Sequence, residues 1–193
     1  MGTLSLVTGP TTWPLSVADC KQHLRIDHSD EDTLIEGYLR AATAQAETVL
    51  DRQIMPATWR LSFHGFCGWQ IDIPKPPLQS VSSITYLDTA GTTQTLSSSL
   101  YIVDTYSEPG RITPAYNAVW PSVRWQMNSV IITFVAGYTS ALVVPDRIKT
   151  GIKFLVSQWY EHRELTTGGI EMSSEVERAF RALIIGDAVL GYF

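Results

Sequence analysis

Helical periodicity at both ends of the chain, with a block of short strands between them, is the pattern that most constrains the fold. Apolar side chains recur at helical spacing in residues 15–50 and again after Pro145. Residues 56–140 instead carry short alternating stretches separated by turn residues. Because the two helical ends can pack together as one bundle, the strands are expected to be an insertion within it.

The N-terminal part is predicted to hold an extended arm, residues 1–13, and two helices. Ser16 can cap the first helix, with Asp19 favouring its positive end. The second helix should start at Ser29 or Asp30. Its apolar face consists of Leu34, Ile35, Tyr38, Leu39, Ala42, Ala46, Val49 and Leu50. The side chains expected to face away are Glu36, Arg40, Thr43 and Glu47.

The middle of the chain predicts an antiparallel sheet or a small sandwich. Its two clearest hairpins turn at residues 88–91 and 108–110. The expected strands are residues 59–63, 69–73, 81–87, 93–96, 101–104, 111–113 and 130–135.

The C-terminal part predicts two more helices and an apolar tail. Pro145 suits the first position of a helix. After an expected break at residues 165–169, Ser174 and Glu177 have the spacing of a capping box. Residues 187–193 end in apolar side chains, which is unusual for a chain end and favours docking onto the body or onto another protein.

Charge and cysteine content exclude several classes of protein. The formal net charge of −5 argues against a dedicated nucleic-acid binder, which needs clustered Lys and Arg. Two cysteines do not make a disulfide framework, and residues 1–10 lack the pattern of a secretory signal, so synthesis in a reducing cytoplasm is expected. No apolar run approaches the roughly 20 residues needed to cross a bilayer.

Chemical sites have little support. The pairs Cys20 with His23 and His64 with Cys67 form a ligand set that suits zinc, but nothing in the sequence brings them together. A cysteine nucleophile would need an orienting partner that no local pattern supplies. We therefore expect no catalytic residue, no cofactor and no metal. A metal-dependent or thiol enzyme is kept as an alternative hypothesis.

Aromatic and apolar side chains offer better candidates, for a protein interface. Trp120, Arg124 and Trp125 fall in a predicted loop, and exposed aromatic–Arg clusters are common interface anchors. Core packing is the alternative for the tryptophans. The tail adds Leu190, Tyr192 and Phe193 as candidate contacts.

Several short motifs follow one another along the chain. They are Pro14-Leu15-Ser16, Leu24-Arg25-Ile26-Asp27, Asp30-Glu31-Asp32-Thr33-Leu34-Ile35, Val49-Leu50-Asp51-Arg52, Val130–Val135 with Ala136-Gly137-Tyr138, Val144-Pro145 and Trp159-Tyr160-Glu161-His162-Arg163-Glu164. In this order they make the chain resemble the head–tail connector (adaptor) family of long-tailed double-stranded DNA phages and gene transfer agents. Residues 59–127 match that family only as a β insertion, and the chain ends in Tyr192-Phe193 rather than near an arginine.

The resemblance implies a non-enzymatic subunit of a ring of about twelve copies, whose side contacts are heterologous. The ring lies at the neck of the virion, bridges the portal protein to a stopper or tail-completion protein, and is made in the bacterial host cytoplasm. Double-stranded DNA passes through it without specific binding, which fits the acidic net charge. We expect the tail after Gly186 to reach the portal.

Together these patterns predict an α+β protein: a bundle of about four helices with an inserted antiparallel β-sheet or small sandwich. Residues 1–55 form the arm and two bundle helices, 56–140 the β insertion, 141–186 the C-terminal helices and 187–193 the tail. The alternative to a connector is a β-rich carbohydrate- or protein-binding module of a tail or baseplate.

Overall fold

The computed structural model describes residues 2–162 and 174–187. Contacts between Cα atoms divide the chain into two compact units. The β unit comprises Met1–Thr11 and Met55–Thr139, and the helical unit comprises Thr12–Ile54 and Ser140–Phe193. The expected α+β class, with helices from both ends of the chain and an antiparallel β insertion, is confirmed.

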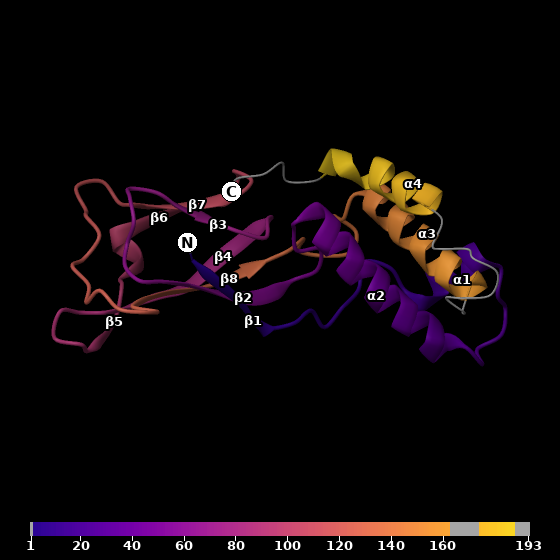
Figure 1. Ribbon diagram of the computed structural model, residues 1–193, viewed down its shortest axis with the longest axis horizontal. Coiled ribbons are helices and arrows are strands. Elements are labelled where there is room, and N and C mark those ends of the chain that lie inside the picture. Colours follow the sequence, from indigo (N-terminus) through magenta and orange to yellow (C-terminus); the bar gives the residue numbers. More distant parts are fainter. Residues whose placement is uncertain (1, 163–173, 188–193) are drawn as a thin grey trace. The chain divides into compact units, whose positions relative to one another are not determined.

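The β unit contains two antiparallel sheets (Figure 1). The five-stranded sheet has the order β1-β2-β8-β4-β5 and the three-stranded sheet the order β3-β7-β6. The strands are β1 (Thr3–Thr8), β2 (Ala57–Phe63), β3 (Ile71–Ile73), β4 (Leu78–Leu87), β5 (Thr93–Thr95), β6 (Tyr101–Asp104), β7 (Gly110–Pro114) and β8 (Val130–Ala136), with a short 3-10 turn at Ser98–Leu100.

Both sheets contribute to one apolar core, as in a small sandwich. Ile84, Ile132 and Phe134 come from the larger sheet, and Ile73 and Ile112 from the smaller one. All five side chains are fully buried. Strand β8 lies at the centre of the larger sheet, and buried residues alternate along it with half-buried ones. Both faces of the strand are therefore covered at least in part, which explains its nearly continuous apolar sequence.

The N-terminal arm differs from its expectation, because part of it is a strand. Residues Thr3–Thr8 form β1, which pairs antiparallel with β2 and brings Thr3 opposite Ser62. The arm therefore lies in the β unit, not with the two helices as the 1–55 grouping had it. This pairing joins residues far apart in the sequence, and local spacing carries no signal for it.

The helical unit contains four helices among its described residues (Figure 1). These are α1 (Val17–Leu24), α2 (Asp32–Leu50), α3 (Asp146–Glu161) and α4 (Ser174–Ile184), the last followed by a 3-10 turn at Ile185–Asp187. Ala42 and Ala46 of α2 are fully buried, and α2 makes extensive contact with α3. Small side chains on α2 thus permit the close approach that its Ala-rich sequence predicts.

Helix termini follow the predicted caps in part. Ser16 and Asp19 form the full capping box of α1. Helix α2 begins one or two residues later than expected, with Glu31 at the N-cap, and Pro145 occupies the N-cap of α3 rather than its first position. The expected break at residues 165–169 lies outside the described residues.

Four polar residues of α2 were predicted to face away, and for Thr43 and Glu47 this was wrong. Thr43 is buried and its hydroxyl donates to the Leu39 carbonyl 2.8 Å away. Glu47 is half-buried and its carboxylate accepts from the Ile54 N–H at 2.9 Å. Both side chains satisfy local backbone groups, which lets them occupy positions that polarity alone assigns to solvent.

We predict that Gly137→Ala destabilises the protein by more than about 2 kcal/mol. Gly137 has φ +115°, and a Cβ there would lie 2.5 Å from the Met55 carbonyl oxygen, which is rigid backbone. The matched control is Gly37→Ala within α2, where a Cβ meets nothing within 4 Å. That change should stabilise by about 0.5–1 kcal/mol through helix propensity. Urea unfolding measures both; a neutral Gly137→Ala contradicts the strained geometry.

Candidate interaction surfaces

The connection between β7 and β8 is an ordered loop held against the β4–β5 hairpin. The Arg124 N–H donates to the Leu87 carbonyl at 3.0 Å, and the Ser129 hydroxyl bridges the Arg124 carbonyl and the Gln126 N–H. The Arg124 guanidinium covers the hairpin turn, since its Nη1 lies 2.6 Å from where a Cβ on Gly91 would be. Backbone contacts therefore fix the loop that carries the predicted aromatic–Arg cluster.

Trp120 is a packing residue within this loop. Its ring stacks on Phe66 with a centroid distance of 4.7 Å and an interplanar angle of 1°. Its indole N–H donates to the Trp69 carbonyl at 3.3 Å. Trp120 is half-buried against the core of the β unit, so its main contacts are intramolecular.

Trp125, by contrast, is 72% exposed. Its indole lies over Gly65, where a Cβ would be 3.4 Å from the ring. Trp69 is 60% exposed, although the alternating sequence predicted it to be half-buried in a strand. It precedes β3 in an irregular segment, where alternation no longer determines which side chains are covered.

Other exposed apolar side chains extend this loop surface beyond the residues that the sequence singled out. They are Tyr116, Val119 and Met127. Tyr106 is also exposed, but it lies in the β6–β7 turn, at the opposite end of those two strands. Tyr116, at 91% exposure, and Met127, at 80%, lie in the same β7–β8 connection as Trp125. The sequence contains a signal for this exposure, because these apolar residues fall in a turn-rich segment that no strand can carry into the core. Concentrated exposed aromatic and Met side chains are typical of protein interfaces.

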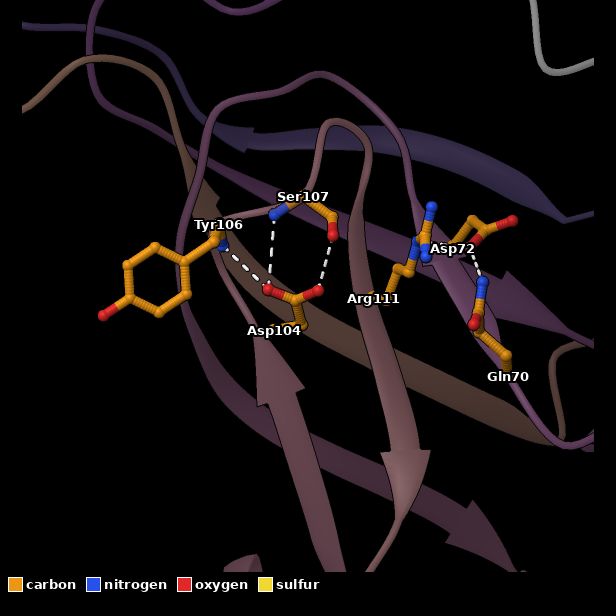
Figure 2. Close-up of polar contacts among 6 residues, drawn as sticks. All are labelled: Gln70, Asp72, Asp104, Tyr106, Ser107 and Arg111. Carbon is orange, nitrogen blue, oxygen red and sulfur yellow. Dashed lines mark hydrogen bonds and ion pairs between the residues drawn. The ribbon is translucent and has the colours of Figure 1, made fainter.

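Polar contacts at the β6–β7 turn have a structural explanation (Figure 2). The Asp104 carboxylate accepts from the Ser107 hydroxyl at 2.5 Å and from the Tyr106 and Ser107 N–H groups at 2.9 and 3.2 Å. These bonds, the Ser107 hydroxyl first, lower the pKa of Asp104. On the same sheet, Gln70 donates to Asp72, which faces Arg111. The carboxylates here stabilise a turn and a sheet edge.

A groove of about 470 Å³ lies within the helical unit, between the start of α1 and the N-terminal half of α3. Its apolar wall includes Trp13, Leu15 and Leu142, and Lys149 and Lys153 of α3 line it as well. Leu142 is 91% exposed. The groove thus offers an uncovered apolar surface next to two ammonium groups.

Asp19 lines the same groove, where its charge is stabilised. Its carboxylate accepts hydrogen bonds from the Ser16 hydroxyl at 2.6 Å and from the Ser16 N–H at 2.8 Å. These two bonds, the hydroxyl first, lower the pKa of Asp19, and Lys153 and Lys149 make smaller contributions in the same direction. Asp19 therefore stays ionised and completes the cap of α1.

The turn between α1 and α2 forms an acidic corner of the helical unit, which we define as Asp27–Leu34. Asp27 and Asp30 are exposed, and the Asp30 side chain is 88% exposed. Asp32 instead pairs with Lys21 at 2.8 Å, and Glu31 accepts a hydrogen bond from the Tyr160 hydroxyl of α3. Leu34 is 36% exposed beside these carboxylates.

The two halves of the hypothesised zinc site lie in different units, Cys20 and His23 in the helical unit and His64 and Cys67 in the β unit. Cys20 is buried in the helical unit, and burial raises the pKa of its thiol to about 11, so it stays protonated. Cys67 is exposed in the β unit. Across residues 2–162 and 174–187, no three His, Cys, Asp or Glu side chains gather in a way that could hold a metal ion.

The remaining predicted contacts, Leu190, Tyr192 and Phe193, lie outside the described residues. No helix in the described part of the chain is both long and apolar enough to cross a membrane.

Comparison with known proteins gives a family match for residues 14–87 and a fold for the chain. Residues 14–87 match the family described as Phage gp6-like head-tail connector protein, which confirms the resemblance seen in the sequence. No curated protein is significantly similar to the chain in sequence.

Solved structures of gene transfer agent (GTA) particles contain chains of the same fold. A chain in the neck of an empty GTA particle with C6 symmetry is 23% identical, with a TM-score of 0.78 over 99% of this chain and 97% of that one. A chain in the virion of a native GTA particle is 23% identical, with a TM-score of 0.79 and the same coverage of both chains. A chain in the neck of a native GTA particle with C12 symmetry is 22% identical, with a TM-score of 0.74 and again that coverage.

We predict that Trp120→Ala and Trp125→Ala differ sharply in stability. Trp120→Ala removes the Phe66 stack and the Trp69 hydrogen bond, and should lower the free energy of unfolding by about 2–3 kcal/mol. Trp125→Ala removes an exposed ring and should lower it by less than about 0.5 kcal/mol. Urea unfolding of the two variants measures the difference, and equal losses would contradict the separate roles of the two rings.

Ser16→Ala should lower stability by about 1 kcal/mol at pH 7, because it removes the cap of α1. The pKa of Asp19 is lowered in the folded protein, so its contribution is present above its ordinary pKa and is lost as pH falls through the folded value. The difference in stability between Ser16→Ala and the parent protein should therefore become smaller below about pH 4. Thermal melts from pH 7 to pH 3 test this, with Ser80→Ala, exposed in β4, as the control. A gap that stays constant with pH would exclude the coupling.

Proposed function

We propose that this chain, whose residues 14–87 belong to the Phage gp6-like head-tail connector family, is a structural subunit of the neck of a phage-like particle. The family match covers α1, α2, β2, β3 and β4. The observation that carries the proposal is the agreement of this match with the fold of a GTA neck chain over 99% of the sequence.

The subunit acts as one segment of a ring around the DNA channel. The C12 symmetry of one structural neighbour supports about twelve copies, each using two different side faces. The portal protein on one side and a stopper or tail-completion protein on the other are the partners that the family resemblance implies.

The distribution of charge suits DNA that passes without being held. The β unit carries four basic and four acidic residues, so the formal net charge of −5 belongs to the segments of the helical unit. An acidic surface repels the DNA backbone and lets it slide. We propose that no specific DNA-binding site exists in this ring.

Two sets of residues are proposed to contact other neck proteins. Arg124 and Trp125 are exposed in the β7–β8 loop, and Trp120 of the same loop stacks on Phe66. The apolar tail, with Leu190, Tyr192 and Phe193, is the second set, and we propose that it reaches the portal.

The role is structural rather than catalytic. The buried Cys20 thiol is held protonated, and the Asp104 carboxylate is fully engaged in a turn. These groups serve packing and local geometry, as expected for a scaffold.

A carbohydrate- or protein-binding module of a tail or baseplate is the second candidate. The exposed indoles of Trp69 and Trp125 favour it, because flat aromatic faces stack well on sugars. In that case the protein would act at the host surface rather than at the neck.

Deleting the gene from a producer strain separates the two functions. Electron microscopy should show DNA-containing or leaked heads beside finished, unattached tails, and a plasmid copy of the gene should restore joined particles. Joined particles that fail to infect would instead move the protein to the tail tip and overturn the connector function.

A further inference from the structure

We propose that the acidic corner of one subunit docks into the lysine-lined groove of the next and so forms the side contact of the ring. The inference rests on the proposed connector function, and it names the surfaces that join copies of this chain. Both surfaces belong to the helical unit, within which their positions are defined.

The groove has the composition of an interface that lacks its partner. Its apolar side chains are Trp13, Leu15 and Leu142. Leu142 is 91% exposed and the adjacent Val143 is 58% exposed. Leu142 and Val143 therefore form a small exposed apolar patch at the groove that another chain can cover. The Trp13 ring is held in place by the Arg40 guanidinium, 5.5 Å from its centroid.

Charge selects the occupant. Lys149 and Lys153 line the groove, and two carboxylates, Asp19 and Asp146, lie near them. Asp146 is 3.5 Å from Lys149, but its side chain is 97% exposed, so this pair is weak and leaves Lys149 available to a partner. An incoming surface should therefore pair carboxylates with an apolar side chain. The corner Asp27–Leu34 has this combination, since Asp27 and Asp30 are exposed and Leu34 lies beside them.

A subunit cannot fill its own groove with its own corner. Lys149 lies in the first turn of α3, whereas the corner is fixed to the other end of that helix by the bond from Tyr160 to Glu31. Lys149 and Tyr160 are about 16 Å apart along the helix axis. The corner must enter the groove of another copy, and a contact between two different surfaces repeats around a ring.

Reciprocal charge reversal tests the contact in particles from a producer strain. Lys149→Glu with Lys153→Glu, and separately Asp27→Lys with Asp30→Lys, should each lower the fraction of joined particles at least about tenfold. The quadruple variant restores attraction and should restore joining to near the parental level. The two double variants change the net charge in opposite directions. If both impair joining and their combination restores it, the cause is the contact between the two surfaces and not the total charge.

Disulfide trapping gives a second readout that a folding defect cannot imitate. In a Cys67→Ser background, Lys153→Cys with Asp30→Cys should give a ladder of covalent multimers from oxidised particles, and either cysteine alone should not. Intact necks with no ladder, together with normal joining of both reversal variants, would overturn the inference and leave the connector function standing. Joined particles after gene deletion would overturn both.

Discussion

Strand β8 is the element on which the β unit depends. It pairs along its whole length with β2 on one side and with β4 on the other. Val130, Ile132, Phe134 and Ala136 on its inner face are fully buried, and the smaller sheet packs on the same core. Because a strand paired on both edges leaves no backbone group unsatisfied, β8 fixes the register of its neighbours and the positions of the loops they carry.

The helical unit depends on close packing instead of pairing. Ala42 and Ala46 let α2 approach α3, and Gly151 of α3 lies where any Cβ would be 2.8 Å from Ile184 of α4. Leu142, by contrast, is left exposed beside the groove. A unit that has a buried core and also an open groove is suited to assembly with further copies.

The two units divide the proposed tasks according to their surfaces. The β unit is electrically balanced and exposes aromatic side chains in its loops, which suits specific contacts with partner proteins. The helical unit carries the net acidic charge, and Lys149 and Lys153 line one of its grooves, which suits an orienting contact between copies and a channel that DNA does not bind. A connector needs both kinds of surface, because its ring must hold together and also hold its neighbours.

The four helices, the hairpins at residues 88–91 and 108–110, the Ser16–Asp19 cap and the family match of residues 14–87 could be predicted from the sequence, since each of these depends on near neighbours in the chain. Tertiary structure alone decided that residues 3–8 join a sheet, that Thr43 is buried, and that Trp120 packs while Trp125 and Trp69 are exposed. It also decided that Trp13, Leu142 and Lys153 share one groove. These outcomes depend on contacts between residues distant in sequence, and the free energy of such contacts is set by which surfaces meet, a quantity that local spacing does not contain.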